Sequence, residues 1–296
     1  MQATLRRPQF WFGLCTLGPI LAWYAIFPFW SILNAVFISL VNYQLLEPSK
    51  SKFVGLKNFT DLAANPLFWT SLQQTFVYAV ELFVALLPLA VLVACCLVKV
   101  VRARNAYQFV VFLPVVVSLV AISLLFKTLM DPQIGLFNQI LSIVHLPESK
   151  FLASSDTALS SVVAVDAWKS LGFYVVIVSA GMLGIPQHVY ESAMLDGANV
   201  LDRFWHITLP LLGHTLTLVS ILIVFQGLQV FTQVMVLPPT PGGPGRSTYV
   251  MNLFIYDQAF SQLRFGFATA AAFVLFIIVF ALTMIQLKLV RPNWSY

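Results

Sequence analysis

Residues 185–210 have the sequence IPQHVYESAMLDGANVLDRFWHITLP, a mostly polar, helix-prone stretch between two long apolar segments. A Glu-Ser-Ala triplet at 191–193 is followed, after three residues, by Gly197. Nine further residues separate Gly197 from Ile207, and the stretch then ends in Ile-Thr-Leu-Pro at Pro210. By its pattern alone, this stretch is either an ordinary amphipathic connector or a specific coupling element.

The composition around this stretch is that of a membrane protein. Hydrophobic residues make up 59% of the 296 positions and charged residues only 9%, against roughly 25% charged residues in ordinary soluble domains. The net charge of +5 is modest and argues against a nucleic-acid partner. The apolar fraction predicts an all-α polytopic membrane protein in which residues 1–296 form a single transmembrane domain.

Six segments are apolar over about the 20 residues that a membrane-spanning helix requires. They cover residues 10–41, 72–98, 107–129, 159–183, 207–237 and 266–287. The first is longer than the apolar part of a signal peptide and is followed by no small-x-small cleavage site, so we expect it to be retained as an anchor.

Basic residues near the helix ends predict the orientation of the chain. With the N-terminus inside, the cytoplasmic side holds the basic cluster on the shortest loop, at 99–104, together with Arg6, Arg7, Arg203, Lys288 and Arg291. The counts on the two sides differ little, but short loops dominate the rule, so this cluster decides it. Both termini and the connector at 185–206 are then expected in the cytoplasm.

The connector resembles the EAA loop of bacterial ABC-importer permeases. That family has Glu-Ala-Ala, three residues, Gly, nine residues and then Ile-x-Leu-Pro; the departure here is Ser192 in place of the first Ala. Three further segments are similar to the sugar permeases of the maltose and glycerol-phosphate type. They are FVGLKNF at 53–59, GGPGRSTYVMNLFIYDQAF at 242–260 and RFGFATAAA at 264–272.

This resemblance implies the six-helix fold of a type I ABC-importer permease. It also implies a heterodimer with a sister permease, two cytoplasmic ATPase subunits, and an extracytoplasmic substrate-binding protein, all in a bacterial inner membrane and in contact with its lipid. No cofactor is expected on this chain, because G-x-x-x-x-G-K-[ST] does not occur in it. ATP and Mg would be bound by the partner ATPase, and the sugar or polyol carried is left open.

The connector is the candidate for coupling to that ATPase. A short helix over 191–205 would lie along the membrane surface, with small residues that allow close docking and carboxylates that supply charge. Pro210 would begin the next span, where its missing N–H costs little. The coupling residues expected are Glu191, Ser192, Ala193, Asp196, Gly197, Ile207, Leu209 and Pro210.

Polar residues inside the spans form two one-sided stripes. Asp166, Lys169 and Ser170 share a face of the fourth span, and Gln226, Gln229 and Gln233 share a face of the fifth. Ionisable groups in spans are costly and usually face a cavity or a partner helix. We expect these stripes to line the substrate pathway; the alternative is helix–helix hydrogen bonding with an internal Asp166–Lys169 pair.

Two other classes of function remain as alternatives. A secondary transporter or channel would require no ATPase, and would be expected to carry an inverted repeat with paired broken helices, which the sequence does not display. A membrane-embedded enzyme would require a catalytic set, and Asp166 with Lys169 is the only candidate pair. No catalytic residues are predicted, and the histidines lack the spacing of metal ligands.

Overall fold

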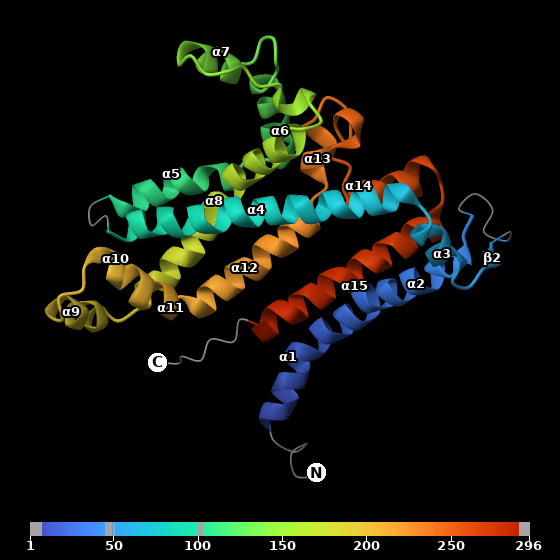
Figure 1. Ribbon diagram of the computed structural model, residues 1–296. Coiled ribbons are helices and arrows are strands. Elements are labelled where there is room, and N and C mark those ends of the chain that lie inside the picture. The colour runs from blue at the N-terminus through green and yellow to red at the C-terminus, as the bar shows by residue number, and fades with distance from the viewer. Residues whose placement is uncertain (1–7, 45–48, 50, 100–102, 290–296) are drawn as a thin grey trace. The chain divides into compact units, whose positions relative to one another are not determined.

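A computed structural model of the chain describes residues 8–44, 49, 51–99 and 103–289 (Figure 1). Arg6, Arg7, Arg102 and Arg291, on which part of the orientation argument rests, lie outside the described residues. The described chain is mainly helical and forms two compact units, one from Met1–Asn65 with Ile255–Leu275 and one from Pro66–Phe254 with Phe276–Tyr296.

The first unit contains an N-terminal helical segment, a small sheet and the beginning of the last helix. In chain order its elements are α1 (Pro8–Tyr24), the π-helix η1 (Ala25–Phe29), α2 (Trp30–Ser39), β1 (Val41–Asn42), β2 (Lys52–Phe53), α3 (Lys57–Ala63), the π-helix η6 (Asp257–Ser261) and the start of α15 (Phe265–Leu289). β1 and β2 are antiparallel, with Val41 opposite Phe53. The buried amide of Asn58 donates to the carbonyls of Ser39 at 2.7 Å and Val41 at 3.1 Å, which ties α3 to the end of α2.

The second unit is built on long helices with short helices between them. Its elements are α4 (Pro66–Lys99), α5 (Arg104–Val116), α6 (Leu119–Leu129), α7 (Leu136–Ile143), the 3₁₀ turn η3 (Phe151–Ala153), α8 (Ala158–Leu183), α9 (Gln187–Leu195), α10 (Val200–Arg203), the π-helix η4 (Phe204–Thr208), α11 (Leu209–Leu211), α12 (Gly213–Leu228), α13 (Thr232–Val236) and the 3₁₀ turn η5 (Pro244–Arg246). α14 (Met251–Tyr256) begins in this unit and ends in the first.

α8 is the central helix of the second unit. It packs against α4, α5 and α12, and most of its residues between Ala158 and Val178 are buried. α4 and α12 also approach closely, because a Cβ on Gly227 would lie 2.7 Å from the Cα of Ala79. Small residues allow membrane helices to come this close. In a lipid environment, the resulting van der Waals contacts hold the helices together, because lipid provides no hydrophobic driving force between them.

Five helices of the described chain are long and apolar enough to cross a membrane. They are Trp11–Ser39, Pro66–Lys99, Ala158–Leu183, Gly213–Val236 and Phe265–Lys288. A sixth span results if α5 and α6 count as one, although these two helices are bent by 91°. The composition therefore predicts the polytopic all-α class correctly, but not the break in the third segment.

The break between α5 and α6 differs from the single helix expected over 107–129. Val117 is extended, with φ −72° and ψ 143°, and Ser118 stands at the N-cap position of α6. Pro114 followed by three valines explains the weakness of the helix here, since proline lacks an N–H and β-branched residues favour extended backbone. The apolar length of this segment alone does not reveal the break.

Candidate functional site

A buried carboxylate, Asp166, lies at the centre of the polar residues of the second unit. The side chain is 1% exposed. Its Oδ2 accepts a hydrogen bond from the Tyr78 hydroxyl of α4 at 2.8 Å. Its Oδ1 accepts from the amides of Gln226 in α12 at 3.0 Å and Gln233 in α13 at 2.9 Å. Asp166 therefore joins four helices, and these bonds compensate for the burial of a carboxylate that only accepts when ionised.

A second ring of contacts fixes the orientation of Gln226. The Tyr174 hydroxyl donates to Gln226 Oε1 at 2.7 Å, so the amide nitrogen turns the other way. That nitrogen donates to both Asp166 Oδ1 and Ser170 Oγ, the latter at 2.9 Å. Ser170 and Gln226 are half-buried, whereas Asp166 and Gln233 are buried. The polar cluster thus has a closed side and a side that remains accessible.

Two of the six residues predicted for the pathway do not join this cluster. Gln229 is exposed at the C-cap of α12. Lys169 instead reaches α5, where its ammonium donates to the Val115 carbonyl at 3.2 Å. That carbonyl is close to the end of α5, where the helix break removes its usual partner. Lys169 therefore caps a broken helix instead of making the internal pair with Asp166 considered above.

Tyr78 and Tyr174 belong to the cluster but are absent from the predicted set. Tyr174 follows Ser170 by four residues and Asp166 by eight, so it continues the same helical stripe. Extending the stripe by one turn would have found it. Tyr78 sits in a long apolar helix, where only its hydroxyl distinguishes it from the neighbouring aromatic residues.

The connector at 185–206 is two helices, not the single short helix expected over 191–205. Gly197 has φ +84° and ends α9. The N–H of Gly197 bonds to the Met194 carbonyl at 3.1 Å, and that of Ala198 bonds to the Ala193 carbonyl at 2.9 Å. This is a Schellman motif, which requires a left-handed residue at the position of Gly197.

α10 begins immediately after this turn with a capping box. Asn199 Oδ1 accepts from the N–H groups of Leu201 and Asp202, each at 2.9 Å. The Asp202 carboxylate accepts in return from the Asn199 N–H at 3.2 Å. The side chains of Asn199 and Asp202 therefore make their hydrogen bonds to the backbone of the turn itself. The connector is therefore a rigid helix–turn–helix, with its local bonds satisfied internally.

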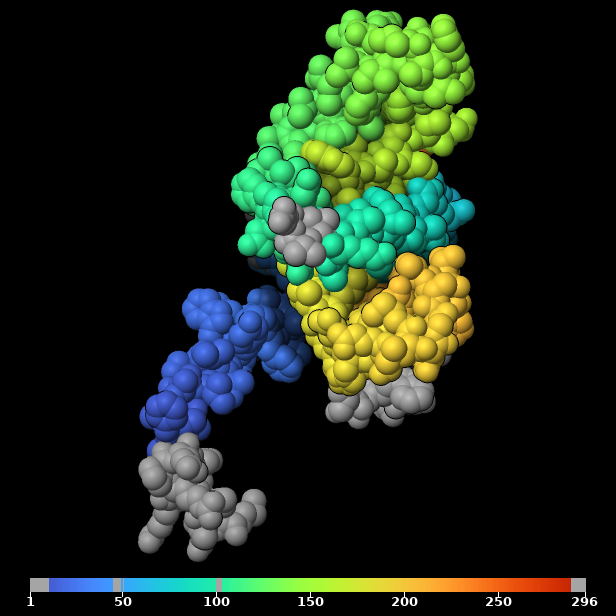
Figure 2. Space-filling model, turned by 90° about the vertical axis from the view of Figure 1, so that its left-hand side faces the viewer, coloured from blue at the N-terminus to red at the C-terminus, as the bar shows by residue number. Residues whose placement is uncertain are grey.

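The connector exposes large apolar side chains. Leu195 is 90% exposed and Leu201 67% exposed, and Met194, Val200 and Trp205 are also exposed. In the space-filling view, α9 to α11 form a yellow-to-orange ledge beside the teal end of α4 (Figure 2). Clustered exposed apolar residues on a structured element are typical of an interaction surface.

The residues predicted for coupling lie along this connector with different exposure. Glu191, Ser192, Asp196, Gly197 and Pro210 are exposed, and Ala193, Ile207 and Leu209 are half-buried. Gln187 donates to Glu191 at 2.8 Å. The hydroxyls of Tyr190 and Thr208 share a hydrogen bond of 3.0 Å, which joins α9 to η4.

In the described ranges, no group of three or more His, Cys, Asp or Glu side chains is placed to hold a metal ion. The polar cluster around Asp166 contains hydroxyls, amides and one carboxylate. Such groups suit hydrogen bonding with a neutral polar solute.

No model of a known protein family matches the chain. Among characterised proteins, the chain is 34% identical over 278 residues to a probable ABC transporter permease of Bacillus subtilis, covering 91% of this chain and 93% of the relative. The chain belongs to the ABC transporter permease family. The trehalose/maltose transport permease of Thermococcus litoralis is 30% identical, with 94% of this permease and 93% of that protein covered.

A solved structure of a bacterial alginate ABC transporter, in complex with an alginate pentasaccharide-bound periplasmic protein, has the same fold. Its TM-score is 0.82 at 22% identity, covering 96% of this permease and 95% of that chain. These similarities confirm the polytopic permease fold expected from the sequence. The chain is a multi-pass membrane subunit of a transporter and not its ATPase, so the secondary-transporter and enzyme alternatives are set aside.

Proposed function

We propose that this permease is a transmembrane subunit of a binding-protein-dependent importer for a sugar, with a di- or oligosaccharide or a related polyol as substrate. The supporting observation is similarity over nearly the whole chain to a permease named for trehalose and maltose transport. The hydroxyl and amide groups around Asp166 agree with this class, because sugars are recognised by hydrogen-bonding side chains combined with aromatic faces.

The proposed complex contains this permease, a sister permease, two ATPase subunits that bind ATP and Mg, and an extracytoplasmic binding protein. It lies in a bacterial inner membrane with both termini of this chain in the cytoplasm. Lys99, Arg104 and Arg203 then lie on the cytoplasmic side, in agreement with the preference of short cytoplasmic loops for basic residues.

The connector at 185–206 is proposed to transmit the closing of the ATPase dimer to the spans. Its turn is held by backbone hydrogen bonds at Gly197 and by the Asn199 capping box, so α9 and α10 move as a unit. Its exposed Leu195 and Leu201 offer an apolar contact to a soluble partner. The short path from Thr208 through Pro210 to α12 links this contact directly to a span.

The pathway is proposed to follow the accessible side of the polar cluster. Ser170, Gln226 and Gln229 are the polar groups available to a solute, since they are half-buried or exposed. On the buried side, Asp166 accepts a hydrogen bond from Gln226 and another from Gln233, which fixes the position of the Gln226 amide. In this proposal the buried residues position the binding groups, and Lys169 stabilises the break in the third span.

The experiment is co-purification from the native membrane under mild detergent, followed by mass spectrometry of the bound chains. A second permease and an ATPase with a phosphate-binding loop are expected. Leu195→Glu combined with Leu201→Glu should abolish ATPase recovery and leave the sister permease bound. Ile143→Glu, on a residue of α7 that is 76% exposed, is the matched control. A chain that purifies without any ATPase would overturn the proposal.

A further inference from the structure

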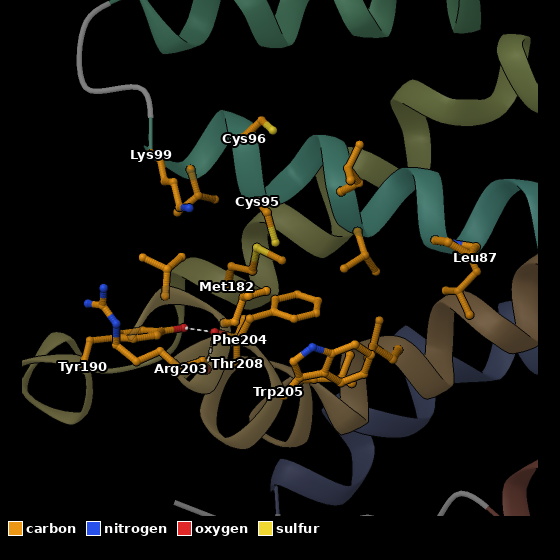
Figure 3. Close-up of a pocket in the computed structure, with 18 residues that line it drawn as sticks. Leu87, Cys95, Cys96, Lys99, Met182, Tyr190, Arg203, Phe204, Trp205 and Thr208 are labelled. Atoms are coloured by element: carbon orange, nitrogen blue, oxygen red, sulfur yellow. Dashed lines mark hydrogen bonds between the residues drawn. The ribbon is translucent and has the colours of Figure 1, made fainter. Parts of the chain in front are cut away.

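An apolar groove of about 750 Å³ lies between α4, the end of α8 and the α10–η4 segment (Figure 3). Its lining includes Leu87, Val91, Leu92, Phe204, Trp205 and Leu216. Trp205 is 59% exposed and Leu92 is 61% exposed. Exposed apolar walls of this kind are typical of a surface that another molecule covers.

Two cationic side chains lie at one end of this groove. Lys99 is the last residue of α4, and Arg203 is the last residue of α10; both line the groove. Figure 3 shows them at the same end as Tyr190, whereas Leu87 lies at the opposite end. Arg203 Nε donates to the Asn199 carbonyl at 3.4 Å, which holds the stem of this side chain against α10.

The length of the groove matches one leaflet of a bilayer. Leu87 and Lys99 are twelve residues apart in α4, which corresponds to about 18 Å at the helical rise of about 1.5 Å per residue. Half of the hydrocarbon core of a bilayer is about 15 Å. An acyl chain that extends from the headgroup level to the bilayer midplane would therefore follow α4 from Lys99 to Leu87.

We propose that this groove binds one anionic phospholipid, with an acyl chain along α4 and the phosphate between Lys99 and Arg203. The combination of a leaflet-long apolar channel with cations at one end favours this occupant, because a helix of a partner subunit would not need the charged end. The assignment to the cytoplasmic leaflet rests on the orientation in the proposed function.

Such a lipid would contact the α4 end and the connector together. Phe204, Trp205 and Thr208 of the π-helix η4 line the groove opposite Cys95 and Cys96 of α4. An acyl chain between them fills the space that separates the connector from the span. The lipid would in this way stiffen the joint between the connector and α4.

The test uses the assembled complex in nanodiscs with equal amounts of phosphatidylglycerol and phosphatidylcholine of identical acyl chains. After mild detergent extraction, native mass spectrometry counts the lipids that stay bound. About thirtyfold preferential retention of phosphatidylglycerol is expected from two cations near the headgroup. Lys99→Gln with Arg203→Gln should reduce the ratio to about one. Lys52→Gln with Lys150→Gln, at two exposed lysines outside the groove, should preserve it.

A photo-crosslinking residue in place of Leu92 identifies the occupant directly and does not depend on folding of the charge variants. An adduct with the mass of a phospholipid supports the proposal. Equal retention of the two lipids in the unmodified complex overturns it, and so does an adduct with the sister permease. Loss of ATPase co-purification would instead contradict the proposed function, so the two failures are distinguishable.

Discussion

The hydroxyl of Tyr174 donates to Gln226 Oε1 at 2.7 Å, and this bond determines which end of the amide faces Asp166. An amide that rotated by half a turn would direct its oxygen at the carboxylate and lose the bond to Asp166. The contact is part-buried, because Tyr174 is 2% exposed and Gln226 is half-buried. One hydroxyl on α8 therefore orients the polar group that α12 offers to the cluster.

Tyr174→Phe is expected to lower the stability of the permease by about 1 kcal/mol, because one part-buried hydrogen bond is lost while the ring remains. The apparent melting temperature in detergent should fall by roughly 2–4 °C. Tyr24→Phe, at a residue that is 62% exposed, should leave the melting temperature unchanged. Equal shifts in the two variants would count against an orienting role.

Gln229 and Gln233 have the same side chain, but Gln229 is exposed and Gln233 is buried against Asp166. Substituting each in turn therefore distinguishes contact with the solute from structural support of the cluster. Gln229→Ala should weaken transport, seen as an increase in KM, and leave the melting temperature unchanged, because Gln229 is exposed. Gln233→Ala should lower stability by about 1–3 kcal/mol, because it removes a donor from the buried Asp166. A stable Gln233→Ala variant would contradict the supporting role.

Lys169→Met tests whether this ammonium caps the break between α5 and α6. The Val115 carbonyl loses its donor, and we expect a loss of about 1.5–3 kcal/mol for a hydrogen bond to a charged group. Amide hydrogen exchange should increase at the end of α5 and the start of α6. Lys169→Arg retains a donor and should protect these amides. If Lys169→Met impaired transport and left amide hydrogen exchange unchanged, Lys169 would instead be assigned to the substrate pathway.

The sequence was sufficient for the class of fold and for placing Ser170 beside Asp166, four residues apart on one helix. Gln226 and Gln233 were predicted to share a face of one span, whereas they lie on separate helices, α12 and α13. The sequence was insufficient where the backbone conformation of one residue determines how two helices are joined, as at Val117. The apolar length of 107–129 conceals the break at Val117, and Lys169 has its role only because of that break. Tyr78 was missed because its contact with Asp166 joins residues 88 positions apart in the chain.

The connector illustrates the same limit at Gly197. Spacing alone allowed a continuous helix in which Ala193, Gly197 and Val200 share a face. The observed φ of +84° at Gly197 instead ends α9, and the Asn199 capping box starts α10. The sequence Gly-Ala-Asn-Val-Leu-Asp at 197–202 contained this signal, as the pattern of a helix end followed by an N-cap.

We expect the stability of the turn after α6 to depend on pH, because the Asp131 carboxylate holds this turn. Its Oδ1 accepts hydrogen bonds from the backbone N–H groups of Ile134 at 3.1 Å and Gln133 at 2.9 Å. These bonds, with the Ile134 bond first, hold the pKa of the carboxyl below its usual value. The contribution of a group with a lowered pKa is present above its unfolded pKa of about 3.9. It is lost as the pH falls through the folded pKa.

Protection of the Gln133 and Ile134 amides should therefore decrease as the pH is lowered below about 4. Hydrogen exchange, corrected for the intrinsic pH dependence of the amides, measures this effect. Asp131→Asn retains an acceptor oxygen but cannot ionise, so its protection should be independent of pH over the same range. A pH dependence that persists in Asp131→Asn would assign the effect to another group.

Gly197 offers a test of coupling that does not change any side-chain contact. A Cβ at this position would meet nothing within 4 Å, so a substitution acts only through the positive φ. Asparagine tolerates the left-handed region, whereas a β-branched residue resists it by about 1–2 kcal/mol. Gly197→Asn should thus retain binding-protein-stimulated ATPase activity in the reconstituted complex, and Gly197→Val should lose most of it. Both variants should insert into the membrane in equal amounts, because the turn lies outside the spans. Full stimulated activity in Gly197→Val would mean that the turn between α9 and α10 is not required for coupling.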